Sequence, residues 1–193
     1  MGCNRVRRKL GASGLESFLH ITFLWLHLLG VALWVGPQVF LAVAWGPASR
    51  QIADLPTRVA AMKTMTRRFG YLGGVGLALI IVAGTYLVFT WRDYYAIPGD
   101  TEFTSLRFGV WFIVKMNVLV LMLVVVGLHI VWAGPKQLRL YEAMARGEPV
   151  DEAALRRVRA VSMTLSLLGL LLSLVMMVMG VMIGTSEWSF QEV

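Results

Sequence analysis

The sequence predicts an all-α membrane protein whose four transmembrane helices form an up-down bundle. Of its 193 residues, 58% are hydrophobic and only 15% are charged, and its mean hydropathy of +0.70 lies far from that of ordinary soluble domains. Four apolar runs, each long enough to cross a bilayer, alternate with segments that hold nearly all of the lysines and arginines. These observations predict one membrane domain, residues 1–193, with spans at about 18–44, 69–91, 108–133 and 158–185.

The charge and cysteine content exclude several classes of protein. The formal net charge of +7 suggests an anionic partner, but the basic residues flank the apolar runs instead of forming one patch. We therefore interpret them as topology signals that face anionic lipid, and we expect no nucleic-acid partner. The single cysteine, Cys3, excludes an intrachain disulfide, a CxxC metal site and a covalently attached c-type haem.

The first apolar run, residues 18–44, carries two histidines at membrane depth. His20, His27 and Trp34 are spaced seven residues apart, which returns them to nearly the same side of an α-helix. Ionisable groups inside a span are rare and usually face the bundle interior, so this face is a candidate functional site. Pro37 follows on the same helix, where the missing amide donor is expected to bend the segment near Leu33.

The segment 45–68 is basic, is interrupted by Pro47 and Pro56, and is expected to contain a surface helix. The second span, residues 69–91, is rich in glycine, which leaves room for a neighbouring helix. Close helix contact is therefore predicted at Gly70, Gly73, Gly74, Gly76 and Gly84. The segment 92–107 combines aromatic and acidic residues with two arginines and is expected to face outward.

The third span, residues 108–133, is the second polar helix, because it contains Lys115, Asn117 and His129. We expect Asn117 to form an interhelical hydrogen bond, and Gly134-Pro135 to end the helix. After the mixed-charge segment 136–159, in which Asp151 is expected to cap the next helix, the fourth span at 158–185 is predicted to serve mainly in packing.

The distribution of basic residues predicts the orientation in the cytoplasmic (inner) membrane. The segments 45–68 and 136–159 together hold eleven lysines and arginines, whereas residues 1–13 and 92–107 hold six. The positive-inside rule therefore places the segments 45–68 and 136–159 in the cytoplasm and both termini outside.

The polar groups of spans one and three are expected at comparable depths. Spans one and three run in the same direction in an up-down bundle, which places His27 and Lys115 about 14 and 10 Å from the same membrane edge. His27 is then a candidate axial ligand of haem iron or a proton relay, or a packing histidine. Lys115 is a candidate ligand, proton donor or propionate partner, or a side chain that extends to the surface.

The other two histidines are candidates for a second site. His129 lies about 21 Å deeper than Lys115, so it is expected to bind a metal or cofactor in the other leaflet, or to pack. His20 lies near the interface and is a candidate for cofactor binding or proton exchange.

Methionines near the end of the fourth span suggest a different metal. Met176, Met179 and Met182 fall near one helix face, and thioethers suit Cu(I). Methionine is also a common residue for filling irregular gaps in a core. A copper site and plain packing are both consistent with this pattern.

Three stretches resemble one superfamily of membrane proteins. The run LHLLGVALWVGPQVFLAVAWGPASR from Leu26 resembles the first helix of the HemJ-type protoporphyrinogen oxidases and of the related membrane domain of CopD copper-resistance proteins. RRFGYLGGVGLALIIVAGTYL from Arg67 resembles their second helix. VKMNVLVLMLVVVGLHIVWAGPKQLRL from Val114 resembles the helix that carries their lysine and histidine. The similarity covers most of the chain and lies mainly in hydropathy and spacing.

The resemblance implies a cofactor and an activity. His27 matches the histidine of the family's first helix and Lys115 the lysine of its third, the residues associated with haem b and with catalysis in HemJ-type proteins. The oxidases carry an arginine shortly before that lysine, whereas here the nearest preceding arginine is Arg107. The implied substrate is protoporphyrinogen IX, with electrons passing to quinone or a respiratory partner.

The sequence thus leads to one main hypothesis and two alternatives. The main hypothesis is an integral membrane b-type haem protein with redox activity. The first alternative is a CopD-like copper transport or resistance protein, and the second is an accessory subunit of a larger membrane complex. The number of haems and the oligomeric state, a homo-oligomer included, stay open at this point.

Overall fold

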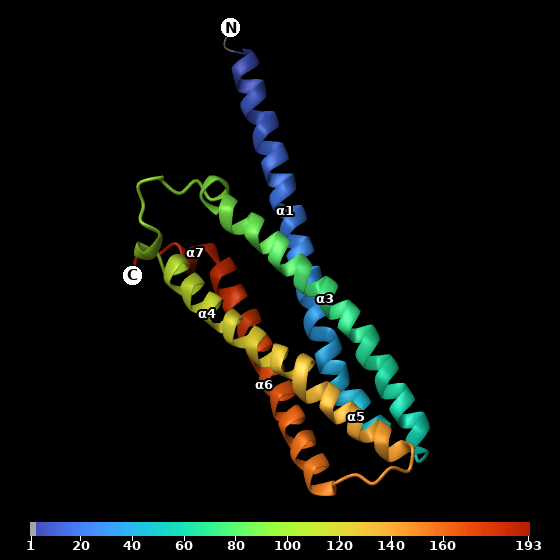
Figure 1. Ribbon diagram of the computed structural model, residues 1–193. Helices are drawn as coiled ribbons and strands as arrows, with labels where there is room; N and C mark the ends of the chain where they lie inside the picture. The colour runs from blue at the N-terminus through green and yellow to red at the C-terminus, as the bar shows by residue number, and fades with distance from the viewer. Residues whose placement is uncertain (1–2) are drawn as a thin grey trace. The chain divides into compact units, whose positions relative to one another are not determined.

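The computed structural model describes residues 3–193, with side chains from Gly14 onward, and within that range the protein consists of helices joined by loops, with no β-strand (Figure 1). Its helices are α1 (Cys3–Phe40), α2 (Gly46–Arg50), α3 (Leu55–Tyr94), α4 (Arg107–Leu128), α5 (Gly134–Ala145), α6 (Glu152–Gly184) and α7 (Ser186–Ser189). Four continuous helical stretches are long and apolar enough to cross a membrane, namely Gly14–Arg50, Leu55–Tyr94, Arg107–Ala145 and Glu152–Gly184. The predicted class, an all-α multi-pass membrane protein with four spans, is confirmed.

Two long helices begin at an aspartate that accepts a hydrogen bond from the first turn. The Oδ1 atom of Asp151 accepts from the backbone nitrogen of Ala153 at 2.8 Å, as expected from the sequence. The Oδ2 atom of Asp54 accepts from the backbone nitrogen of Thr57 at 2.9 Å. Because the first amides of a helix have no partner within it, these carboxylates stabilise the starts of α6 and α3.

The prediction that Gly134-Pro135 ends the third helix is wrong. A π-helical turn, His129–Ala133, connects α4 to α5, and the amide of Gly134 donates to the carbonyl of His129. Proline has no amide hydrogen and clashes with the carbonyl four residues earlier in an α-helix. The wider π turn accommodates that residue, so the chain continues as α5.

A second π-helical turn before a Gly-Pro pair lies near the end of the first span. Pro37 lies inside α1, and the π-helical turn Leu41–Trp45 connects α1 to α2, which has Pro47 in its first turn. The next helix, α3, begins at Leu55, so much of the segment 45–68 is helical, as expected. This helical part is continuous with the second span and does not form a separate surface helix.

The chain divides into two compact units. The first unit contains the residues up to Trp34 together with Leu72–Thr101, and the second contains Val35–Tyr71 together with Glu102–Val193. Helices α1 and α3 each contribute residues to both units.

In the first unit, glycines bring the backbones of α1 and α3 together (Figure 1). A Cβ atom at Gly30 would lie 2.8 Å from the carbonyl oxygen of Gly76, and a Cβ atom at Gly76 would lie 2.8 Å from the carbonyl oxygen of Gly30. Close contact of the second span is therefore confirmed for Gly76, and also for Gly84. Gly70 and Gly74 have nothing within 4 Å of a built Cβ, so they do not serve this contact.

In the second unit, α4 packs against α6 through buried residues of both helices. Met122 and Val125 are buried on α4, and Ser162, Ser173 and Met179 are buried on α6. Many large apolar side chains of this unit point outward. Val131, for example, is 79% exposed. An apolar exterior with few buried side chains is the arrangement expected of helices surrounded by lipid.

The C-terminal residues of the second unit are held against the start of α4. The amide of Arg107 donates to the carbonyl of Gln191, and the amide of Val193 donates to the carbonyl of Ser105, both at 3.0 Å. The rings of Phe108 and Phe190 lie 5.8 Å apart in the same region. Short backbone bonds and aromatic contacts thus fix the end of the chain to the second unit.

Candidate functional site

His27 lies in the first unit, where α3 presents a glycine to it. Its Nδ1 atom is 3.0 Å from the backbone carbonyl oxygen of Ile80. A Cβ atom at Gly84 would lie only 3.0 Å from the Cε1 atom of His27. In an α-helix, residue i+4 lies beside the carbonyl of residue i, so the absent side chain of Gly84 exposes the Ile80 carbonyl to the imidazole.

This contact determines the chemistry of the His27 ring. A carbonyl oxygen only accepts hydrogen bonds, so Nδ1 carries the proton and donates it to Ile80. Nε2 then carries the lone pair that a metal or a proton donor requires. Histidines that bind metals usually donate their other ring N–H to a carbonyl or carboxylate in this way.

His20 lies two helical turns from His27 in the same unit and is 7% exposed. Its ring stacks on Tyr94, with centroids 3.5 Å apart and planes within 3°, and meets the edge of Tyr95 at 6.0 Å. Burial raises the pKa of the Tyr95 phenol, and the neighbouring Tyr94 raises it further. The Nδ1 atom of His20 is buried and has no hydrogen-bond partner among the described residues.

Lys115 lies in the second unit and points toward α6. Its Nζ atom is 3.5 Å from the position of a Cβ atom at Gly180, and the side chain is half-buried. Within residues 14–193 this ammonium forms no hydrogen bond or ion pair. A lysine in an apolar span without a counter-charge carries a cost that usually marks a functional residue.

His129 and Asn117 have partners within the second unit. The Nδ1 atom of His129 lies 3.5 Å from the hydroxyl of Ser162 and 3.3 Å from that of Ser166, and its Nε2 atom lies 3.4 Å from Ser166. These are contacts between α4 and α6 of the kind that joins helices in a membrane. The prediction of an interhelical hydrogen bond for Asn117 is wrong, because its side-chain amide donates to the carbonyl of Ile113 in its own helix at 2.9 Å.

The methionines of the copper alternative lie on α6 in the second unit. Met179 is buried at 5% exposure, and Met176 and Met182 are half-buried. Nearby on the same helix, the hydroxyl of Ser173 donates to the sulfur of Met122 at 3.3 Å. Methionine sulfur thus takes part in the packing of α4 against α6, and the copper site stays a prediction.

The structure places the predicted site residues in both units. His20 and His27 belong to the first, whereas Lys115, His129 and the three methionines belong to the second. The predicted meeting of His27 with Lys115 therefore stays a prediction. Among the described residues, no group of three or more histidine, cysteine or acidic side chains could hold a metal ion. Haem iron does not require such a group, because the porphyrin supplies most of its ligands.

A correspondence between His27 and Lys115 was missed in the sequence. Each lies nineteen residues before the glycine of a Gly-Pro pair, Gly46 for His27 and Gly134 for Lys115, and each pair follows a π-helical turn. Each side chain also meets a glycine of the next long helix, as described above. The shared Gly-Pro spacing was the signal that the sequence offered for this correspondence.

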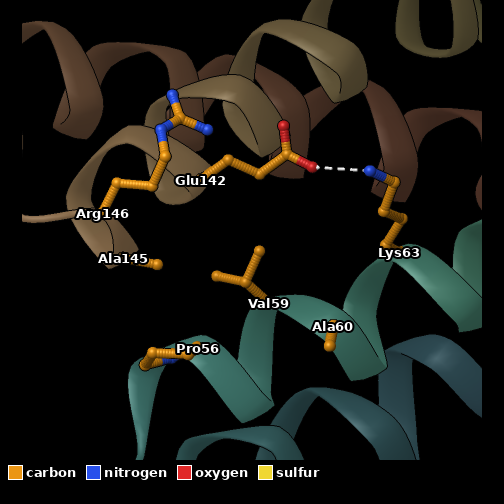
Figure 2. Close-up of a pocket in the computed structure, with 7 residues that line it drawn as sticks. All are labelled: Pro56, Val59, Ala60, Lys63, Glu142, Ala145 and Arg146. Atoms are coloured by element: carbon orange, nitrogen blue, oxygen red, sulfur yellow. Dashed lines mark hydrogen bonds and ion pairs between the residues drawn. The ribbon is translucent and has the colours of Figure 1, made fainter.

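The second unit also contains an open cleft of about 410 Å³. Figure 2 shows Pro56 and Val59 of α3 facing Ala145 of α5, while Lys63 points toward Glu142. The Nζ atom of Lys63 is 3.0 Å from the Oε1 atom of Glu142. Such an exposed pair contributes little to stability, and no pattern in the sequence predicted this cleft.

The remaining cation of the cleft is also paired. Arg146 lies at the end of α5, and its Nε atom is 2.6 Å from the Oε1 atom of Glu148. This hydrogen bond raises the pKa of the Arg146 guanidinium and lowers the pKa of the Glu148 carboxyl. The cations of the cleft are therefore neutralised by carboxylates, which disfavours an anion site here.

Comparison with known proteins finds no matching family model, no matching curated protein and no matching solved structure.

Proposed function

We propose that the protein is an integral membrane redox protein that binds a b-type haem, and that His27 would hold its iron. The bond from Nδ1 of His27 to the carbonyl of Ile80 carries this proposal, because a histidine that binds a metal usually donates its other ring N–H to a carbonyl in this way. The resemblance to the HemJ and CopD superfamily supports the same residue. When bound, haem supplies reversible one-electron transfer.

The protein's part in this chemistry is to position the imidazole and to set its surroundings. Ile80 fixes the tautomer of His27, and Gly84 provides the space for its ring. The hydrogen bond to Ile80 also makes Nε2 a stronger donor to a metal. The surrounding apolar helices keep water away and lower the local dielectric, which tunes the redox potential of a bound group.

Lys115 is proposed as the second ligand or as the charge partner of a propionate. This role rests on the resemblance and on the cost of a lysine that lacks a counter-charge among the described residues. As a ligand, Lys115 would be a neutral amine; as the partner of a propionate, it would be an ammonium. These two roles predict different results when Lys115 is replaced. Loss of a ligand changes the absorption bands of the haem, whereas loss of a charge partner lowers haem affinity and leaves the bands in place.

The proposal is tested by reduced-minus-oxidised absorption spectra of the protein purified from haem-sufficient cells. We expect a b-type spectrum for the wild type and none for His27→Gly. Added imidazole is expected to restore the spectrum of His27→Gly, because it replaces the missing ligand in the vacated space. Lys115→Met is recorded alongside to distinguish its two roles.

The matched control is Asn117→Leu, since Asn117 is exposed and bonded within its own helix. Circular dichroism and gel filtration show whether each variant is folded. Absence of haem absorbance in the folded wild type would overturn the proposal, and so would an unchanged spectrum in folded His27→Gly. A positive result makes oxidation of protoporphyrinogen IX by the purified protein the next assay.

A further inference from the structure

A group of basic residues borders the cleft of the second unit, where the start of α3 and helix α5 run antiparallel (Figure 2). Val59 of α3 faces Ala145 of α5. Four residues later on α3, Lys63 reaches Glu142, which lies three residues earlier on α5. Each step along α3 toward the second span is therefore matched by a step back along α5 toward the third span.

Both helices carry basic residues on the membrane side of this ion pair. At a rise of about 1.5 Å per residue, they lie about 5 to 9 Å from the pair along the helix axes. The antiparallel register places the residues of both helices at the same level, and all of them are exposed. This basic cluster consists of Arg67 and Arg68 of α3 and Lys136 and Arg139 of α5.

The positive charges of the basic cluster are not neutralised by the protein. The segments 64–71 and 134–141 contain no aspartate or glutamate, and no residue of the cluster forms an ion pair within residues 14–193. The acids of the neighbouring segments are engaged elsewhere: Glu142, Glu148 and Glu152 form ion pairs, and Asp54 and Asp151 cap helices. The cluster therefore presents four cations to an external anion.

The neighbours of the basic cluster place it at the level of lipid headgroups. The Nζ atom of Lys136 lies 6.0 Å from the ring centre of Trp132, which is exposed. Exposed tryptophans in membrane proteins are typical of the interface between hydrocarbon and water. On the other side of the cluster from the cleft, the exposed side chains are large and apolar, among them Tyr71 and Val131. The cluster thus begins where the lipid-facing surface ends.

We infer that the basic cluster binds the phosphate of an anionic phospholipid, whose acyl chains lie along the exposed apolar side chains beside it. A guanidinium donates two parallel hydrogen bonds to a phosphate, and a lysine ammonium adds a point charge. A zwitterionic headgroup brings its own ammonium, which four cations without a carboxylate repel. The inference is independent of the haem proposed above and stands or fails separately.

The test is native mass spectrometry of the full-length protein in a mild detergent, in which the lipid-bound fraction is measured as lipid is added. We expect phosphatidylglycerol to bind about tenfold or more tightly than phosphatidylcholine or phosphatidylethanolamine with the same acyl chains. Glycerol phosphate, the soluble part of the anionic headgroup, is expected not to bind at the same concentrations, because it has no acyl chains to contact the apolar surface.

The cluster itself is tested with two double variants of equal charge. Arg67→Gln with Arg139→Gln is expected to weaken phosphatidylglycerol binding by about tenfold or more. The matched control is Arg146→Gln with Arg156→Gln, which removes two arginines of the same unit that are already paired with carboxylates. The control is expected to bind like the wild type. All four arginines are exposed, so both double variants are expected to fold, which circular dichroism verifies.

Three results would overturn the inference. Equal binding of phosphatidylglycerol and phosphatidylcholine would show that the cluster does not select an anionic headgroup. An equal loss of affinity in the two double variants would show that only the total charge matters. Binding of glycerol phosphate as tight as that of phosphatidylglycerol would assign the cluster to a soluble phosphate instead of a lipid.

Discussion

Replacing Gly76 with alanine tests the contact on which the first unit is built. A Cβ atom at residue 76 would lie 2.8 Å from the carbonyl oxygen of Gly30 and 2.9 Å from the amide nitrogen of Trp34. Ordinary van der Waals contact begins at 3.4 Å, so α1 and α3 must separate by about 0.6 Å, because close-packed backbone atoms have no room to yield individually. Overpacking of this kind costs about 1–3 kcal/mol.

Gly74→Ala is the matched control for this substitution. It lies on the same helix, but a Cβ atom there has nothing within 4 Å. Both substitutions gain the same helix propensity, about 1 kcal/mol, so the difference between them isolates the overpacking. We expect Gly76→Ala to have a free energy of unfolding about 1–3 kcal/mol below that of Gly74→Ala.

The assay is reversible unfolding in mixed detergent micelles, followed by circular dichroism and tryptophan fluorescence. Equal stability of the two variants, or a more stable Gly76→Ala, would refute the close crossing of α1 and α3 at Gly30 and Gly76.

Three further predictions concern other residues. In Gly84→Ala, the new methyl group would lie 3.0 Å from the Cε1 atom of His27 and displace its ring. We expect the folded Gly84→Ala protein to lose most of its haem absorbance. The control Gly127→Ala, where a Cβ atom has open space around it, is expected to retain it. Asp151→Ala removes the cap of α6 and is expected to lower the free energy of unfolding by about 1 kcal/mol in the micelle assay; no change would contradict the cap. Hydrogen bonds from Thr57 lower the pKa of Asp54, so its contribution to stability is present at neutral pH and is lost as the pH falls through that lowered pKa. Asp54→Asn is therefore expected to differ from the wild type in melting temperature at neutral pH but not in strong acid, and a difference that persists there would count against the ionised cap.

Much of the fold was predictable because a bilayer permits few alternatives. Lipid offers no hydrogen bonds to the backbone, so each apolar run of sufficient length must form a helix. The number of spans and the cap at Asp151 followed from local sequence, and both are confirmed. The extents of the helices did not follow, since Pro135 in the sequence signals an end whereas the π turn before it lets the helix continue.

The candidate site was predictable only in part. A histidine or lysine within an apolar run is conspicuous, so His27 and Lys115 were found from the sequence. Their partners were not, because hydropathy and helical spacing do not reveal which residue of a neighbouring helix faces a given side chain. The same reason explains the error for Asn117, whose amide bonds to Ile113 of its own helix.

By itself, the sequence determined that this is an all-α, multi-pass membrane protein with ionisable groups inside its spans. Only the tertiary structure decided that Gly84 gives His27 access to a backbone carbonyl, and that His20 is buried against Tyr94. The physical reason is that composition and periodicity determine helix formation and burial in lipid, whereas hydrogen bonds between helices depend on crossing points where single glycines let two backbones approach.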